Sequence, residues 1–145
     1  MLKWTMIGVL AVLLLVSVAP ANAGDGVPSG KWWRNPKVVE EINITPQEQE
    51  KLDESFLQFQ RDSIDVKSRL EKERLELDHL MSRKSIDEKE AKAAMSEVDK
   101  ARSELADRRF EFLLEVRNIL GNERFNELKD KFREYRKNRR GERRR

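Results

Sequence analysis

The sequence predicts an all-α protein built on a long antiparallel helical hairpin, with short helices at its N-terminal and C-terminal ends. The composition favours long helices, because 39% of the residues are charged, 7% are aromatic, and only six Gly and four Pro occur in 145 residues. Apolar residues also alternate spacings of four and three over two long stretches, which is a helical period. One thin hairpin covers each helix on a single side, so we expect it to form a dimer.

The first 23 residues have the pattern of a cleavable secretory signal. Lys3 gives a positive start, residues 6–18 are apolar, and Ala21-Asn22-Ala23 is a sequence that signal peptidase accepts. We expect cleavage after Ala23, because the apolar run is shorter than the roughly 20 residues of a membrane anchor. There is no Cys, which excludes a lipoprotein anchor and disulfides. The mature chain is thus expected to be exported and soluble.

Residues 24–34 form the expected flexible leader, since their first part is rich in Gly, Pro and Ser. Trp32 and Trp33 end this leader, and they either cover the hairpin as a clasp or stay exposed for binding. Asn35-Pro36 then predicts a helix start, with Asn as the N-cap and Pro in the first turn. We place the helical hairpin domain at residues 35–135.

The first long helix begins at a capping box. Thr45 and Glu48 can each accept a hydrogen bond from the other's backbone amide, and Pro46 suits the first helical position. From there no Gly or Pro occurs up to Ser82. The predicted seam consists of Leu52, Phe56, Phe59, Ser63, Val66, Leu70, Glu73, Leu77 and Leu80. We expect Leu57, Ile64 and Leu75 to widen this seam.

A tight loop follows at residues 82–85, and Ser85 with Glu88 reads as a second capping box. The returning helix carries a seam of Ala91, Ala94, Val98, Ala101, Leu105, Phe112, Val116 and Ile119, with a second stripe of Phe110, Leu113 and Leu120. Gly121 suits a C-cap and Asn122 an N-cap. A last helix is predicted from its seam of Phe125, Leu128, Phe132 and Tyr135.

Residues 136–145 read RKNRRGERRR, with seven basic residues and one acidic residue. No apolar residue occurs there, so we expect a disordered basic tail. Arg-rich tracts of this kind bind nucleic acid, but we expect no nucleic-acid partner because the protein is expected to be exported. An anionic membrane surface is the alternative partner, and a merely solubilising tail is the other interpretation.

The sequence offers little for catalysis or metal binding. It has one His, no Cys, no Gly-rich phosphate loop and no motif that marks a nucleophile, so we expect no enzyme. His79 is the weak candidate for a zinc or other transition-metal ligand, but such metals favour several converging imidazole or thiolate groups. We therefore expect no cofactor, and interpret His79 as an exposed helix residue.

The chain resembles the periplasmic CpxP/Spy/ZraP family of stress-induced helical proteins, which includes metal-resistance sensors. The resemblance rests on the layout of residues 31–136 and on a Leu-Thr-x-x-Gln motif at two helix starts. Here the copies read Ile44-Thr45-Pro46-Gln47-Glu48 and Leu120-Gly121-Asn122-Glu123-Arg124, so Glu and Arg stand in place of the final Gln. The resemblance implies a periplasmic location and a bent hairpin that dimerises into a cradle.

Three functions follow as alternatives. The first, partly implied by the resemblance, is an ATP-independent holdase chaperone for unfolded envelope proteins. Its candidate client-contact residues are Trp32, Trp33, Phe56, Phe59, Phe110, Phe112 and Phe125. The second is a heavy-metal-responsive accessory or sensor that contacts a membrane sensor protein. The third is a structural coiled-coil interaction protein.

Overall fold

The computed structural model describes residues 30–142, so the predicted signal at residues 1–23 and most of the leader lie outside the described residues. The all-α prediction is confirmed: the elements are a 3-10 helix η1 (Trp32–Arg34) and the α-helices α1 (Pro36–Ile42), α2 (Pro46–Met81), α3 (Glu88–Leu120) and α4 (Asn122–Glu142). No strand occurs among the described residues. None of the helices in this part of the chain combines the length and apolar character needed to cross a membrane.

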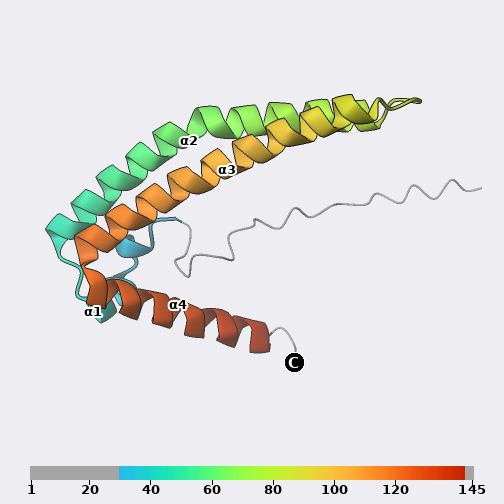
Figure 1. Ribbon diagram of the computed structural model, residues 1–145. Helices are drawn as coiled ribbons and strands as arrows, with labels where there is room; N and C mark the ends of the chain where they lie inside the picture. Colours follow the sequence, from blue (N-terminus) through green and yellow to red (C-terminus); the bar gives the residue numbers. More distant parts are fainter. Residues whose placement is uncertain (1–29, 143–145) are drawn as a thin grey trace, which may run out of the picture.

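Helices α2 and α3 lie side by side and run in opposite directions, joined by a short loop at one end of a long, gently bent rod (Figure 1). At the other end α4 turns back beneath the rod, and η1 and α1 fill the angle between them. The layout therefore has a thin tip at the loop and a thicker end where four helices meet. We call this thicker end the bend. Dimerisation stays a prediction.

Most of the predicted helix starts are present. The Asn35 side chain accepts a hydrogen bond from the Lys37 amide, with Pro36 in the first turn. At the start of α2, Thr45 Oγ1 accepts from the Glu48 amide at 3.2 Å and a Glu48 carboxylate oxygen accepts from the Thr45 amide at 3.0 Å. These reciprocal bonds satisfy two backbone donors that a helix leaves unpaired. The capping box is thus confirmed.

The predicted capping box at Ser85 is wrong. Asp87 is the N-cap of α3, and its carboxylate accepts from the Lys89 and Glu90 amides at 2.9 and 3.2 Å. An N-cap side chain reaches the amides two and three residues ahead, so with α3 beginning at Glu88, Ser85 is too far back to serve. Asn122 is likewise the first residue of α4 rather than its cap, and Gly121 precedes it at φ 79° as the predicted C-cap of α3.

The main core lies inside the bend. Its buried residues come from every helical element: Trp32, Trp33, Ile42, Ile44, Leu52, Val116, Leu120 and Leu128. A second, smaller core of Leu70, Val98 and Ala101 holds α2 to α3 farther along the rod. The small Ala101 lets the two backbones approach closely, as the alanine-rich seam predicts. The packing is thus concentrated at the bend.

Both predicted domain boundaries need correction. Residues 32–34 are not a flexible leader, because Trp32 and Trp33 are buried in the main core. The tail is not disordered over residues 136–142, because α4 continues to Glu142. Arg and Lys are good helix formers and their charge is favourable near a helix C-terminus, so a basic sequence without apolar residues can still extend a helix.

Candidate functional site

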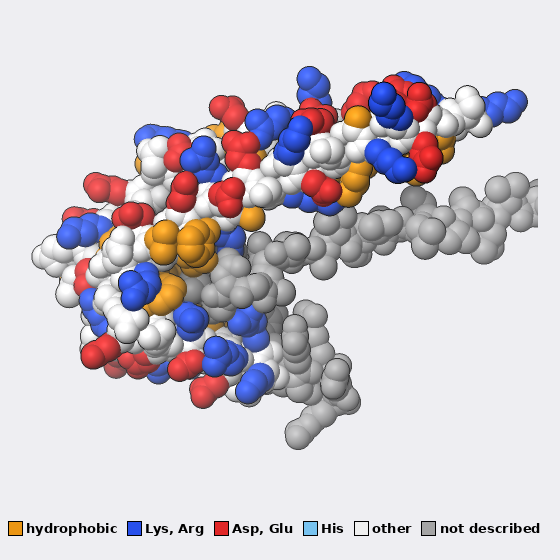
Figure 2. Space-filling model, in the orientation of Figure 1, with side chains coloured by type: hydrophobic (Ala, Val, Ile, Leu, Met, Phe, Trp, Pro, Cys, Tyr) orange, Lys and Arg blue, Asp and Glu red, His pale blue; other side chains and the backbone are white. Residues whose placement is uncertain are grey.

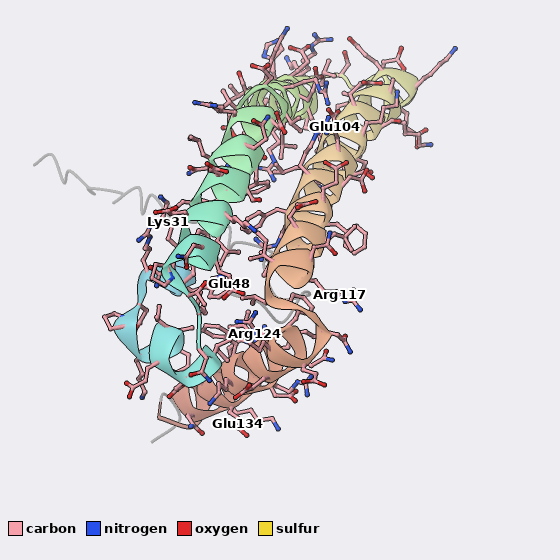
Figure 3. All side chains as sticks on the ribbon, turned by 90° about the vertical axis from the view of Figure 1, so that its left-hand side faces the viewer. Lys31, Glu48, Glu104, Arg117, Arg124 and Glu134 are labelled. Atoms are coloured by element: carbon pink, nitrogen blue, oxygen red, sulfur yellow. The ribbon has the colours of Figure 1, made fainter. Side chains whose placement is uncertain are left out.

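The two copies of the family-like motif meet in space at the bend. Arg124, in the first turns of α4, donates from Nη1 and Nη2 to the two carboxylate oxygens of Glu48 on α2, at 2.9 and 2.5 Å. Figure 3 shows the two side chains pointing toward each other from their separate helices. Glu48 and Arg124 are the two positions where the motif has Gln, so the departures at the Gln position of both copies belong to one ion pair.

Arg124 also binds the ends of two other helices. Its Nε donates to the carbonyl of Leu120 at the end of α3, at 2.9 Å, and Nη1 donates to the carbonyl of Asn43 after α1, at 3.1 Å. Glu48 meanwhile lies in the first turn of α2. The cation therefore lies at two negative helix ends and the anion at a positive one, the favourable placement in each case.

The electrostatics of the pair follow from this geometry. The Arg124 guanidinium lowers the pKa of Glu48 below its ordinary value, and the Thr45 amide lowers it further, while burial opposes both. Glu48 in turn raises the pKa of Arg124. Both shifts favour the charged forms of the two side chains. The ion pair therefore fixes the position of the helices that carry it.

A second polar centre holds the tryptophan segment on α2. Asp53 accepts from Trp33 Nε1 at 3.0 Å, pairs with Lys31 at 3.1 Å, and forms a close ion pair with Arg34. The hydrogen bonds from Arg34 first, then from Trp33 and Lys31, lower the pKa of Asp53 to about 2 against burial. Asp53 thus fixes residues 31–34 through three side chains, and the sequence analysis had not singled it out.

Most of the predicted client-contact residues lie in one aromatic cluster. Trp33 packs edge-on against Phe56, which contacts Phe112, and Phe59 stacks on Phe112 with ring centroids 5.4 Å apart. Trp33 is completely buried and Trp32 is 7% exposed. The alternative in which the tryptophans are exposed is therefore wrong, and the clasp interpretation describes them. Phe56, Phe59, Phe112 and Phe125 are partly buried.

Of the predicted client-contact residues Phe110 stays exposed, and the other exposed apolar side chains belong to positions outside that set. On α3, Phe110 is 60% exposed and Leu114, one turn later, is 44% exposed. On α2, Leu57, Ile64 and Leu75 are 46%, 61% and 63% exposed. Their spacings of seven and eleven residues place them on one face, opposite the buried Val66. They do not widen the seam as predicted, because the seam needs only one face and these three lie on the other.

The bend also presents apolar side chains to solvent. In Figure 2 hydrophobic side chains gather below the last part of α3, between it and the charged surface of α4. Elsewhere on the rod Lys, Arg, Asp and Glu alternate closely, and many form pairs three or four residues apart, such as Glu88 with Lys92 at 3.1 Å. Such exposed pairs contribute little to stability.

The predicted weak metal ligand is at the tip. His79 lies on the exposed surface of α2 near its end. Across residues 30–142 no three His, Cys, Asp or Glu side chains are grouped in a way that could hold a metal ion. Transition metals are held by several converging nitrogen or sulfur ligands. We therefore assign no chemical step to a metal.

Fold and site together define a class: a small all-helical protein whose bent hairpin is closed at one end by an ion pair between two helix starts. The chain belongs to the heavy-metal resistance family, whose model matches residues 7–127. This family includes the periplasmic proteins of the CpxP, Spy and ZraP type, so the resemblance seen in the motif is confirmed. No curated protein and no solved structure matches the chain.

Proposed function

We propose that this member of the heavy-metal resistance family is an ATP-independent, holdase-type chaperone of the bacterial periplasm, and not an enzyme. The observation that supports this most is the pattern of exposed apolar side chains. Phe110 and Leu114 lie one turn apart on α3, and neither is needed by the hairpin seam. Contiguous exposed apolar surface usually marks a contact surface.

The surroundings of this pair suit weak and adaptable binding. Phe110 and Leu114 lie one turn apart on α3, just before its buried residues Val116 and Leu120. Because these two residues are packed in the main core, the backbone that carries Phe110 and Leu114 is held in place. Charged residues such as Glu111 and Glu115 alternate with them along the helix. An unfolded segment can bury its apolar side chains there while the charges keep the complex soluble. No nucleotide is needed for such binding.

The proposal is tested by suppression of aggregation. The full chain, isolated after export, is added without ATP and at near-stoichiometric amounts to a reduced or heat-stressed substrate, and light scattering is followed. We expect the double variant Phe110→Gln/Leu114→Gln to lose most of the protection. The matched control Met81→Gln/Ile86→Gln changes two side chains of similar exposure, 55% and 49%, at the tip.

The control should keep most of the protection, because its residues lie far along the rod from the bend. Circular dichroism must show that both variants retain their helices. A wild-type chain without effect on several substrates would contradict the chaperone function. Equal losses in the two double variants would show instead that apolar exposure in general, and no particular surface, is responsible.

A second candidate is a metal-responsive accessory or sensor, which the family's description as heavy-metal resistance supports. In that function the protein would contact a membrane sensor protein. Isothermal titration with Zn²⁺, Cu²⁺, Ni²⁺ and Co²⁺ tests the metal part. Micromolar binding that is lost in His79→Ala would favour this function, and binding unchanged in that variant would remove His79 from consideration.

A further inference from the structure

The charges of α4 are sorted onto separate faces. Four basic residues recur at steps of four, three and one, which keeps them within about 100° of the helix circumference at 3.6 residues per turn; they are Lys129, Arg133, Arg136 and Lys137. The acidic residues Glu123, Glu127, Asp130 and Glu134 recur at four and three on a neighbouring face. We call the four basic residues the basic face. Figure 2 shows Lys and Arg gathered over α4 and acidic side chains along its lower edge.

Two residues of the basic face, Arg136 and Lys137, lie in the segment that the sequence predicted to be disordered. The backbone of this segment is helical, because α4 continues to Glu142. The last acidic residue before Glu142 is Glu134. The second half of the helix is therefore strongly basic and ordered in its backbone, which fixes the spacing of its charges.

Two of these cations have no acidic partner within the described part of the chain. Arg133 pairs with Asp130 at 3.0 Å and Lys129 lies over the Phe125 ring. For Arg136 and Lys137 no ion pair forms with any described side chain, and Lys137 is exposed. Both also lie beyond Phe132, the last residue of α4 that packs against the main core. In Figure 1 this half of α4 projects away from the bend.

We propose that the basic face of α4 binds the surface of an anionic phospholipid bilayer. A projecting helix can lie along a flat surface, and lipid phosphates can neutralise several evenly spaced cations at once. Tyr135, adjacent to Arg136 and 57% exposed, is a side chain suited to the headgroup region. The contact would hold the protein at a membrane while the exposed pair on α3 stays available. This inference does not rest on the proposed chaperone function.

Vesicle co-sedimentation tests the inference with the full chain, isolated after export. The vesicles are phosphatidylcholine alone or phosphatidylcholine with phosphatidylglycerol, at low and high salt. Each basic residue near an anionic surface contributes about 1 kcal/mol. We therefore expect Arg136→Gln/Lys137→Gln to weaken binding to the anionic vesicles by roughly 25-fold at low salt, with the difference shrinking at high salt.

The matched control is Lys92→Gln/Lys100→Gln, which removes the same charge from exposed positions on α3. We expect it to change vesicle binding by less than about twofold, because its residues lie outside the basic face. Equal weakening in the two double variants would overturn the proposal, since net charge alone would then explain binding. So would equal binding to neutral vesicles, or binding to soluble polyglutamate with none to anionic vesicles.

Discussion

The ion pair between Glu48 and Arg124 gives the sharpest prediction about what holds the bend together. Replacing each residue by Gln restores the amide that the family motif has at that position. Glu48→Gln keeps a side chain that can still cap α2, so it removes the charge and little else. Arg124→Gln removes the charge and also the bonds to the carbonyls of Leu120 and Asn43.

The magnitude follows from the geometry. The side chains of Arg124 and Glu48 are 31% and 17% exposed, so solvent screens the pair only in part. Hydrogen bonds to charged groups contribute about 1.5–3 kcal/mol. We expect Glu48→Gln to lower the free energy of unfolding by about 1–2 kcal/mol and Arg124→Gln by about 2–3 kcal/mol. The double variant should be less destabilised than the sum by about 1–2 kcal/mol, because the second change no longer leaves an unpaired charge.

Urea unfolding followed by circular dichroism measures the four free energies of this double-mutant cycle. The exposed pair of Glu88 and Lys92 is the matched control, with side chains 84% and 75% exposed, and its coupling should be no more than about 0.5 kcal/mol. A coupling for Glu48 and Arg124 as small as the control value would refute the reasoning.

The exchanged pair Glu48→Arg/Arg124→Glu tests the placement of the charges on the helix ends. It keeps opposite charges together but puts a carboxylate against the Leu120 and Asn43 carbonyls and a cation at the start of α2. We expect this variant to be less stable than the double Gln variant. Stability equal to that of the wild type would show that only the pairing of opposite charges matters, and not which charge lies at which helix end.

Three further outcomes are expected. Leu128→Ala empties a completely buried position of the main core and should cost about 2–5 kcal/mol in urea unfolding, against less than about 1 kcal/mol for the exposed Leu114→Ala. Asp87→Ala removes the N-cap of α3 and should lower the free energy of unfolding by about 1 kcal/mol. A larger loss in Ser85→Ala would show that Ser85 is the cap, as the sequence predicted. The pKa of Asp53 is about 2 in the folded protein against an ordinary value of 3.8, so the carboxylate stabilises the fold fully above the ordinary value and loses this effect as pH falls toward the folded value. In Asp53→Asn the free energy of unfolding should therefore fall less over this acid range than in the wild type. An equal fall in the two proteins would contradict the assignment.

What the sequence predicted correctly was local. The capping box of Thr45 and Glu48 involves residues three apart, and the seams depend only on helical period, so neighbouring residues carry the whole signal. The error at Ser85 is local as well. Ser and Asp are both good N-caps, and the sequence Ser-Ile-Asp-Glu contains two of them, so the rule does not say which one the chain uses.

What the sequence could not predict depends on contacts between distant segments. Arg124 lies 76 residues from Glu48, and Trp33 lies 20 residues from Asp53. The sequence did contain a signal for the contact between Glu48 and Arg124, because both residues depart from the motif and they carry opposite charges. In the second case nothing marks Asp53 among many acidic residues of α2. The buried state of the tryptophans follows only when the turn of residues 32–34 is placed over Phe56.

The distribution of packing along the hairpin also bears on function. The bend holds the main core and both polar centres, whereas the rod toward the tip has the small core of Leu70, Val98 and Ala101. Segments with few buried apolar contacts open at lower free energy than a core does, so the tip should exchange its amide hydrogens faster than the bend. Phe110 and Leu114 lie on the stable side of this division. A contact surface there is presented in a fixed geometry, and adaptability has to come from the bound segment rather than from the helix.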